Sequence, residues 1–225
     1  MGRKRAGMAA IDDLLATTAR LRAPDGCPWD RAQTHRTICD CLVEEVAELL
    51  QAIDRNDTAN LREELGDLLF HVALHAQMAS EAGKFTFDDV AREVNEKMVR
   101  RHPHVFGTGE KLGDPEAVVR QWEKIKAVEK GAKPAGVFKE LPAQLGSLLQ
   151  AREVWKQVAK KSLNPGPTVD TAEVYRQAEG LTEAEAGRRL FELVAACREA
   201  GIDPDSALRR HTDGVQRHAE QSAVR

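Results

Sequence analysis

Apolar side chains recur along this chain at steps of three and four residues, which is the spacing of one face of an α-helix. Residues 9–21 show the pattern first, with Ile11, Leu14, Leu15 and Leu21 on one face. The same spacing, interrupted by turn and cap residues, predicts further helices over residues 37–53, 59–82, 86–102, 115–130, 142–160, 169–177, 182–200 and 204–221. No stretch alternates as a half-buried strand does. The pattern therefore predicts an all-α fold, a helical bundle.

Proline and glycine divide the predicted helices into two groups. Residues 131–142 hold two glycines and two prolines, a composition typical of a linker. A chain of 225 residues is long enough for two small domains. We therefore predict one domain over residues 1–130, a linker over 131–141 and a second helical domain over 142–225.

The second and third predicted helices carry a concentration of acidic residues, namely Glu44, Glu45, Glu48, Glu63, Glu64 and Asp67. We expect the two helices to form an antiparallel hairpin about Asn56. Glu48 and Glu64 then come level, because each lies eight residues from the turn and α-helices rise by about 1.5 Å per residue. Glu45 and Asp67, each eleven residues from the turn, come level in the same way. The hairpin therefore predicts four converging carboxylates.

These acids border an apolar stripe that the pattern predicts to be buried: Leu42, Val46, Leu49, Ile53, Leu65, Leu68, Leu69 and Val72. Carboxylates in such a place repel one another and require a compensating cation. An all-oxygen donor set suits Mg²⁺, with Mn²⁺ as a substitute, whereas a di-iron bundle would need the Glu-x-x-His sequence that this chain lacks. The competing interpretation is a solvated face with salt bridges, but few cations are spaced to pair with these acids, and Arg62 is the nearest.

Composition narrows the classes of function. Lys and Arg number 33 against 36 Asp and Glu, and this net charge of −3 argues against a general binder of nucleic-acid backbones. No run approaches the roughly 18 apolar residues of a membrane span, and no apolar signal segment follows the basic first residues. The four cysteines lack CxxC spacing, which suits a reducing compartment. We therefore expect a cytoplasmic protein with neither nucleic acid nor a membrane as its partner.

The acidic pattern is EEVAE at residues 44–48, followed after fifteen residues by ELGD at 64–67. It resembles the EExxE…ExxD signature of MazG nucleoside triphosphate pyrophosphohydrolases. Three flanking segments support the resemblance, in the family's order: GCPWD at 26–30, NEKMVRRHPHVFG at 95–107 and WEKIK at 122–126. The resemblance extends over about residues 14–129, and the four segments in series are far more specific than EExxE alone.

The resemblance implies an all-α hydrolase that uses Mg²⁺ and cleaves nucleoside triphosphates between the α- and β-phosphates, giving a monophosphate and pyrophosphate. It places the metal ligands at Glu45, Glu48, Glu64 and Asp67. Glu44 would bind a further ion or orient the attacking water. Because family members are commonly dimers with sites near the subunit interface, the resemblance also implies a homodimer.

The resemblance further assigns contacts with the nucleotide to Lys97, Arg101, Trp122, Arg62, Trp29, Asn95 and Lys126. Among these, Lys97 and Arg101 would neutralise phosphate oxygens, since they lie four residues apart on one helix face. Trp122 would lie against the nucleotide. The family often has a lysine where this chain has Asn60, so Arg62 would substitute for it.

Two further interpretations compete with the enzyme. One is a non-catalytic nucleotide-binding or regulatory module, and the other is a purely structural bundle, which leaves the clustered acids unexplained. No Walker glycine loop, GxSxG elbow or Cys–His pair offers a different chemistry. His71 and His75 follow Asp67 at helical spacing, and we interpret them as packing histidines rather than ligands.

The second half of the chain repeats part of the first. A shift of 121 positions aligns EELGDLLF at residues 63–70 with AEAGRRLF at 184–191, and a shift of 116 aligns 99–102 with 215–218. Longer MazG proteins are similar in having two such domains in tandem. Here Arg188 replaces Asp67, Asp213 replaces Lys97, and no EExxE precedes them. We therefore predict a degenerate helical copy without a metal site.

Overall fold

The computed structural model describes residues 6–107, 112–129, 137–142 and 145–223, and over these ranges every regular element is a helix. This confirms the predicted all-α class. The chain divides into two compact units, Met1–Ala127 and Val128–Arg225, a division close to the predicted end of the first domain. Among the described helices, none combines the length and the apolar character that crossing a membrane would require.

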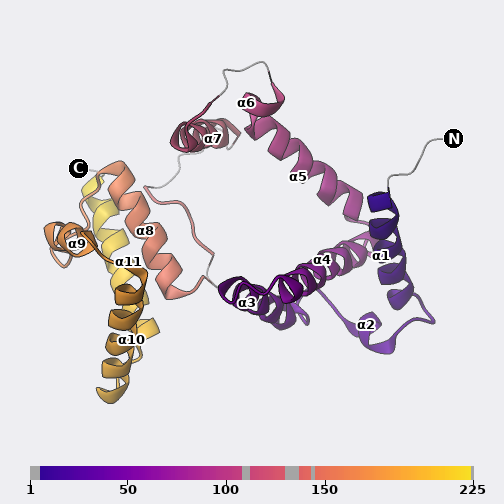
Figure 1. The fold of residues 1–225 in the computed structure, drawn as a ribbon, viewed down its shortest axis with the longest axis horizontal. Coiled ribbons are helices and arrows are strands. Elements are labelled where there is room, and N and C mark those ends of the chain that lie inside the picture. Colours follow the sequence, from indigo (N-terminus) through magenta and orange to yellow (C-terminus); the bar gives the residue numbers. More distant parts are fainter. Residues whose placement is uncertain (1–5, 108–111, 130–136, 143–144, 224–225) are drawn as a thin grey trace. The chain divides into compact units, whose positions relative to one another are not determined.

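The first unit is built on a long helical hairpin (Figure 1). Helix α3 (Cys39–Asp54) packs against α4 (Thr58–Glu81). The chain turns at Asn56, whose φ of 53° is left-handed and is tolerated by asparagine. Asp57 then caps α4 by accepting hydrogen bonds from the backbone N–H groups of its first turn. The hairpin therefore turns where the spacing of the acids predicts.

Further helices of this unit pack on the second half of α4. Helix α1 (Ala6–Arg22) lies along α4, and α5 (Phe87–Arg101) meets it after a capping box at Thr86. Alanines at positions 73, 76 and 79 of α4 are fully buried, and their small side chains let neighbouring helices approach closely. The unit ends at Ala127, within helix α7 (Pro115–Glu129).

Two short helices were not expected from the sequence. Helix α2 (Pro28–Ala32) and helix α6 (Pro103–Phe106) both begin at a proline and lie between the predicted helices. Proline is compatible with a first helical turn, because the N–H group it lacks has no partner there. Arg22, at the end of α1, donates to the backbone oxygens of Asp30 and Gln33 and to the carboxylate of Glu81. This contact fixes the α2 segment to the end of α4.

The predicted burial of the apolar stripe is wrong for a single chain. Five of its eight side chains are 40–52% exposed, namely Val46, Ile53, Leu65, Leu69 and Val72. The other three are half-buried. The physical reason is that α1 packs on the part of α4 that carries the buried alanines, and the helices of the described ranges leave the stripe uncovered.

The second unit contains α8 (Ser147–Lys161), α9 (Thr171–Ala178), α10 (Glu183–Glu199) and α11 (Pro204–Ala223). Helix α8 packs on α11 around buried Val154, Val158, Val215 and Ala219, with half-buried Trp155 beside them. Phe138, in the stretch predicted as a linker, is also buried in this core, while residues 131–136 lie outside the described ranges. Helix α8 begins five residues later than predicted, after Gly146.

Candidate active site

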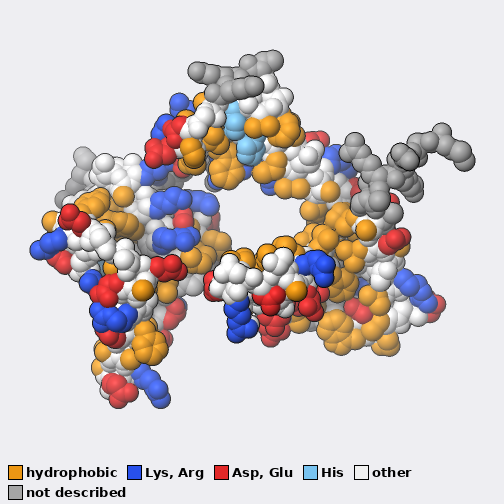
Figure 2. Space-filling view, viewed as in Figure 1, with side chains coloured by type: hydrophobic (Ala, Val, Ile, Leu, Met, Phe, Trp, Pro, Cys, Tyr) orange, Lys and Arg blue, Asp and Glu red, His pale blue; other side chains and the backbone are white. Residues whose placement is uncertain are grey.

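Three carboxylates of the hairpin converge at one place. Glu45 and Glu48 on α3 and Glu64 on α4 each offer an oxygen, and these atoms lie within 4.8 Å of one another. Figure 2 shows acidic side chains gathered on this hairpin. Glu48 and Glu64 are the pair that the helical rise predicts to be level. We call these three residues the acidic cluster.

Glu64 has an unsatisfied carboxylate. Its side chain is only 6% exposed, and its Oε2 is buried without a hydrogen-bond partner. Removal from water raises the pKa of Glu64, and the negative charges of Glu48, Asp67 and Glu45 raise it further. A buried carboxylate oxygen that has no hydrogen bond and is repelled by neighbouring charges destabilises the fold unless a partner compensates for it. A bound cation would satisfy it, and the all-oxygen donor set fits a hard divalent metal ion.

Asp67, the fourth predicted ligand, lies outside the 4.8 Å cluster but is near enough for its charge to act on Glu64. Glu44 is exposed on α3 and is not a member of the cluster. Arg62 is exposed, and in the described part of the chain no Lys or Arg forms a salt bridge with Glu45, Glu48, Glu64 or Asp67. In the described residues these acids therefore lack the salt bridges of the competing interpretation, while Glu44, Glu48 and Asp67 are exposed to solvent.

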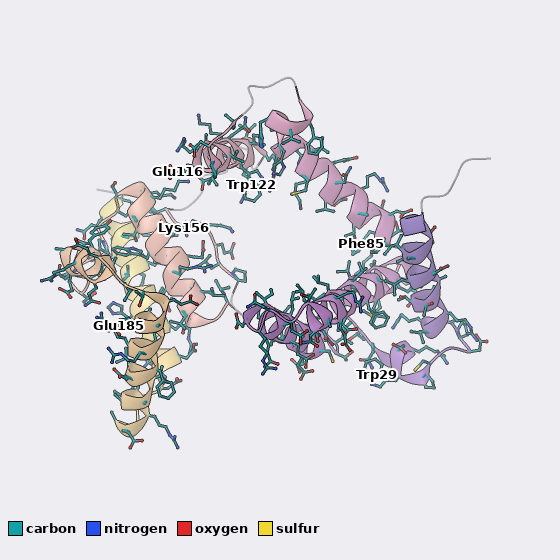
Figure 3. The ribbon with its side chains drawn as sticks, viewed as in Figure 1. Trp29, Phe85, Glu116, Trp122, Lys156 and Glu185 are labelled. Atoms are coloured by element: carbon teal, nitrogen blue, oxygen red, sulfur yellow. The ribbon has the colours of Figure 1, made fainter. Side chains whose placement is uncertain are left out.

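The predicted cations form a second group on α5 and α7. The Arg101 guanidinium lies over the Trp122 ring at 5.7 Å from its centroid, and Lys126 Nζ lies over the same ring at 4.9 Å. Trp122 Nε1 is buried without a hydrogen-bond partner. Trp122 is labelled on α7 in Figure 3, and Figure 1 shows α5 running from beside α1 to α6. Arg101, Trp122 and Lys126, which we call the cation–tryptophan group, therefore lie together on α5 and α7, and none of them belongs to the acidic cluster.

The remaining predicted nucleotide contacts are dispersed. Lys97 is half-buried and Asn95 is exposed, both on α5. Trp29 projects from α2 with 58% of its surface exposed. The structure places neither Asn95 nor Trp29 in the acidic cluster or in the cation–tryptophan group.

Two histidines that the sequence analysis interprets as packing residues, His71 and His75, follow the acids along α4. His71 is 6% exposed, and its Nε2 lies 3.9 Å from Glu45 Oε1, while its Nδ1 is buried without a partner. His75, one turn further along α4, makes a 2.8 Å Nδ1–Nδ1 hydrogen bond with His35, and the two rings stack. Helical spacing from Asp67 could have pointed to His71 and His75. It could not have pointed to His35, which precedes α3.

The second unit carries different chemistry at the matching positions. Glu185, which aligns with Glu64, accepts hydrogen bonds from Arg188 and Arg189. Arg188, which aligns with Asp67, also binds Glu192. These guanidinium groups lower the pKa of Glu185 to about 2, the opposite direction from Glu64. At this position an internal cation already satisfies the acid.

Comparison with known proteins agrees with these features. Residues 33–106 match the family model of the MazG nucleotide pyrophosphohydrolase domain. A Thermotoga maritima protein, named nucleoside triphosphate pyrophosphohydrolase/pyrophosphatase MazG, is 38% identical over 93% of this chain and 83% of its own length. An Escherichia coli protein named nucleoside triphosphate pyrophosphohydrolase is 38% identical over 93% of this chain and 86% of its own.

A solved structure titled as a mazG-related protein from Thermotoga maritima covers 51% of this chain and 97% of its own, with 30% identity and a TM-score of 0.44. A TM-score of 0.44 does not support an argument about the fold, so the all-α class is based on the described helices alone. The sequence similarities confirm the resemblance that the four segments indicate.

Proposed function

The chain belongs to the MazG family of nucleotide pyrophosphohydrolases, and we propose that it hydrolyses nucleoside triphosphates between the α- and β-phosphates with the help of Mg²⁺. The products would be a nucleoside monophosphate and pyrophosphate. The observation that carries the proposal is the acidic cluster, with the buried, unpartnered Oε2 of Glu64 at its centre. Mn²⁺ would substitute for Mg²⁺ in the same oxygen donor set.

Glu45, Glu48 and Glu64 would hold the metal ion, with Asp67 beside them. When bound, Mg²⁺ would neutralise phosphate charge and polarise the phosphoryl group under attack. A water oxygen would attack the α-phosphorus, the bond to the bridging oxygen would break, and pyrophosphate would leave. Glu44, exposed next to the cluster, would orient that water and accept its proton.

The cations would neutralise the phosphate chain. Lys97 and Arg101 lie four residues apart on α5, and Arg101 and Lys126 both lie against Trp122. We propose that Trp122 helps to hold these two cations toward the phosphates, since a cation–π contact contributes about 0.5–2 kcal/mol to the position of a long side chain.

A second copy of the chain would complete this site. The exposed apolar stripe on α3 and α4 is an area that a soluble monomer seldom presents to water. We propose a homodimer in which the partner covers the stripe and brings its own cation–tryptophan group to the acidic cluster. The separation of the two groups within one chain supports this arrangement.

Product analysis tests the reaction. Purified protein with Mg²⁺ and a panel of nucleoside triphosphates should yield monophosphate and pyrophosphate, and chelation by EDTA should abolish both. Asp67→Asn should reduce turnover by at least about 100-fold. Asp54→Asn, the same change at an exposed position of α3 outside the cluster, should not.

The alternative is a nucleotide-binding module without turnover. One observation in the second unit supports this alternative. Glu185, at the position that aligns with Glu64, is neutralised by Arg188. Mg²⁺-dependent nucleotide binding with no product across the panel would favour the module and overturn the proposed hydrolase.

A further inference from the structure

One carboxylate of the acidic cluster has a polar neighbour from outside the cluster. Nε2 of His71, on α4, lies 3.9 Å from Oε1 of Glu45, on α3, so this contact crosses the helical hairpin. The negative charges of Glu45 and Glu64 repel each other. In the described part of the chain no Lys or Arg forms a salt bridge with Glu45. The imidazole of His71 therefore offers Glu45 an attraction that opposes this repulsion.

The His71 ring is held firmly in its place. It is 6% exposed, and the rings of Phe70 and His75 lie 6.4 Å and 6.5 Å from it, measured between ring centroids. Because His71 is removed from water, its attraction to a carboxylate 3.9 Å away is screened less than it would be at an exposed surface. A ring that is already ordered also loses little conformational entropy when it restrains a neighbouring side chain.

The surroundings of the ring indicate which nitrogen carries the proton. A neutral imidazole has one N–H group, and Nδ1 of His71 is buried without a hydrogen-bond partner in either tautomer. The difference between the tautomers therefore lies at Nε2. With the proton on Nε2, an N–H group faces the negative carboxylate of Glu45, which is attractive. With the proton on Nδ1, a lone pair faces that carboxylate, which is repulsive. We therefore assign the proton to Nε2.

We propose that His71 is a positioning residue, whose Nε2–H group fixes the orientation of the Glu45 carboxylate within the acidic cluster for a divalent cation. The inference rests on the proposed function, which makes this cluster a metal site. His71 is not itself a ligand, because among the described residues the three ligand atoms that lie within 4.8 Å of one another belong to Glu45, Glu48 and Glu64. Side chains that orient metal ligands typically change metal affinity by about 10–100-fold.

His75 provides a control on the same helix. It lies one turn beyond His71, and its Nδ1 makes a 2.8 Å hydrogen bond with Nδ1 of His35. Within the described ranges its hydrogen bond and ring contacts are with His35 and His71, and none is with the acidic cluster. Replacing His75 therefore disturbs the packing of α4 without removing the contact between His71 and Glu45.

Binding of Mn²⁺ alone tests the proposal, because the free ion is measured directly by its EPR signal. In the full-length protein, His71→Leu removes the N–H group and should weaken Mn²⁺ binding by at least about tenfold. His75→Leu should leave Mn²⁺ binding nearly unchanged. His71→Gln keeps an N–H donor of similar reach and should restore most of the affinity. Circular dichroism verifies that each variant is folded, and His71→Phe, which keeps a flat ring, replaces His71→Leu if that variant does not fold.

A packing role alone predicts a different pattern. His71→Leu and His71→Gln would then bind Mn²⁺ equally well, and this result would overturn the proposal. An equal loss of affinity in His75→Leu and His71→Leu would overturn it as well. Wild-type affinity in His71→Leu would overturn the role of His71 and leave the proposed hydrolase standing. Wild-type protein that does not bind Mn²⁺ would overturn the metal site of the proposed function and the role of His71 with it.

Discussion

Glu64 and Glu185 occupy matching positions when residues 63–70 are aligned with 184–191, yet their surroundings are opposite. Burial and the neighbouring carboxylates raise the pKa of Glu64, whereas two arginines lower the pKa of Glu185 to about 2. The same residue type is thus left unsatisfied in one half of the chain and satisfied internally in the other. Of the two residues, only Glu64 would be stabilised by binding a cation from solution.

Glu64→Gln should therefore stabilise the metal-free protein, because it removes a charge that its neighbours repel. The variant should show a higher Tm than the wild type in EDTA. Added Mg²⁺ should stabilise the wild type by about 2.7 kcal/mol at 100 times its Kd, and the variant by much less. Differential scanning calorimetry in EDTA and in Mg²⁺ measures both effects. A lower Tm of Glu64→Gln in EDTA would show that the carboxylate is not under repulsion.

At the scale of helices, Arg22 connects three elements through one side chain. Its guanidinium is 10% exposed and binds Glu81 on α4 and the backbone of the α2 segment. The hydrogen bond from Arg22 lowers the pKa of Glu81 below its ordinary 4.5. The contribution of this contact to stability is therefore complete above about pH 4.5 and is lost as the pH falls through the lowered pKa.

Arg22→Ala should lower the free energy of unfolding by about 1.5–3 kcal/mol at pH 7, the range for hydrogen bonds to charged groups. The difference between wild type and variant should stay constant from pH 7 to about 5 and shrink below pH 4. Urea denaturation at several pH values measures the difference. Arg20→Ala, which removes an exposed pair with Asp25, is the matched control and should cost less than 1 kcal/mol. A difference that does not change with pH would contradict the role of Glu81.

Helices and caps were largely predictable from the sequence because they follow from local spacing. The hairpin turn at Asn56, the cap at Asp57 and the capping box at Thr86 all depend on a few consecutive residues. The short helices α2 and α6 were missed because a proline can equally end one helix or begin the next. The pairing of His35 with His75 was not predictable, since it joins residues forty positions apart.

At the scale of the whole molecule, the burial of the apolar stripe differs between the prediction from the sequence and the single chain. Periodicity predicts that Leu65 and Val72 are buried, and in one chain they are 52% and 44% exposed. Hydrophobic periodicity indicates only that one face of a helix favours burial over contact with water. It does not say whether the cover comes from the same chain or from another copy.

Leu65→Asp should therefore dissociate the proposed dimer. A charge at the centre of an apolar interface is left unpaired on burial, which costs several kcal/mol in each of two symmetric positions. Light scattering at micromolar concentration should give the mass of a dimer for the wild type and of a folded monomer for the variant. Leu193→Asp, the same change at an exposed leucine of α10 in the second unit, should remain dimeric. A wild-type monomer would refute the proposed homodimer.

Mixing two inactive variants would test whether each site uses both copies. Asp67→Asn damages the acids and Arg101→Ala damages the cations. If a site takes acids from one chain and cations from its partner, a mixed dimer has one site with both defects and one intact site. Random exchange of subunits should then recover about a quarter of wild-type activity, because half of the dimers are mixed and each has one working site of two.

If each chain builds its site alone, mixing recovers nothing, because every site keeps one defect. Exchange is verified by mass spectrometry of differently tagged chains, so an inactive mixture containing mixed dimers would place acids and cations in the same chain.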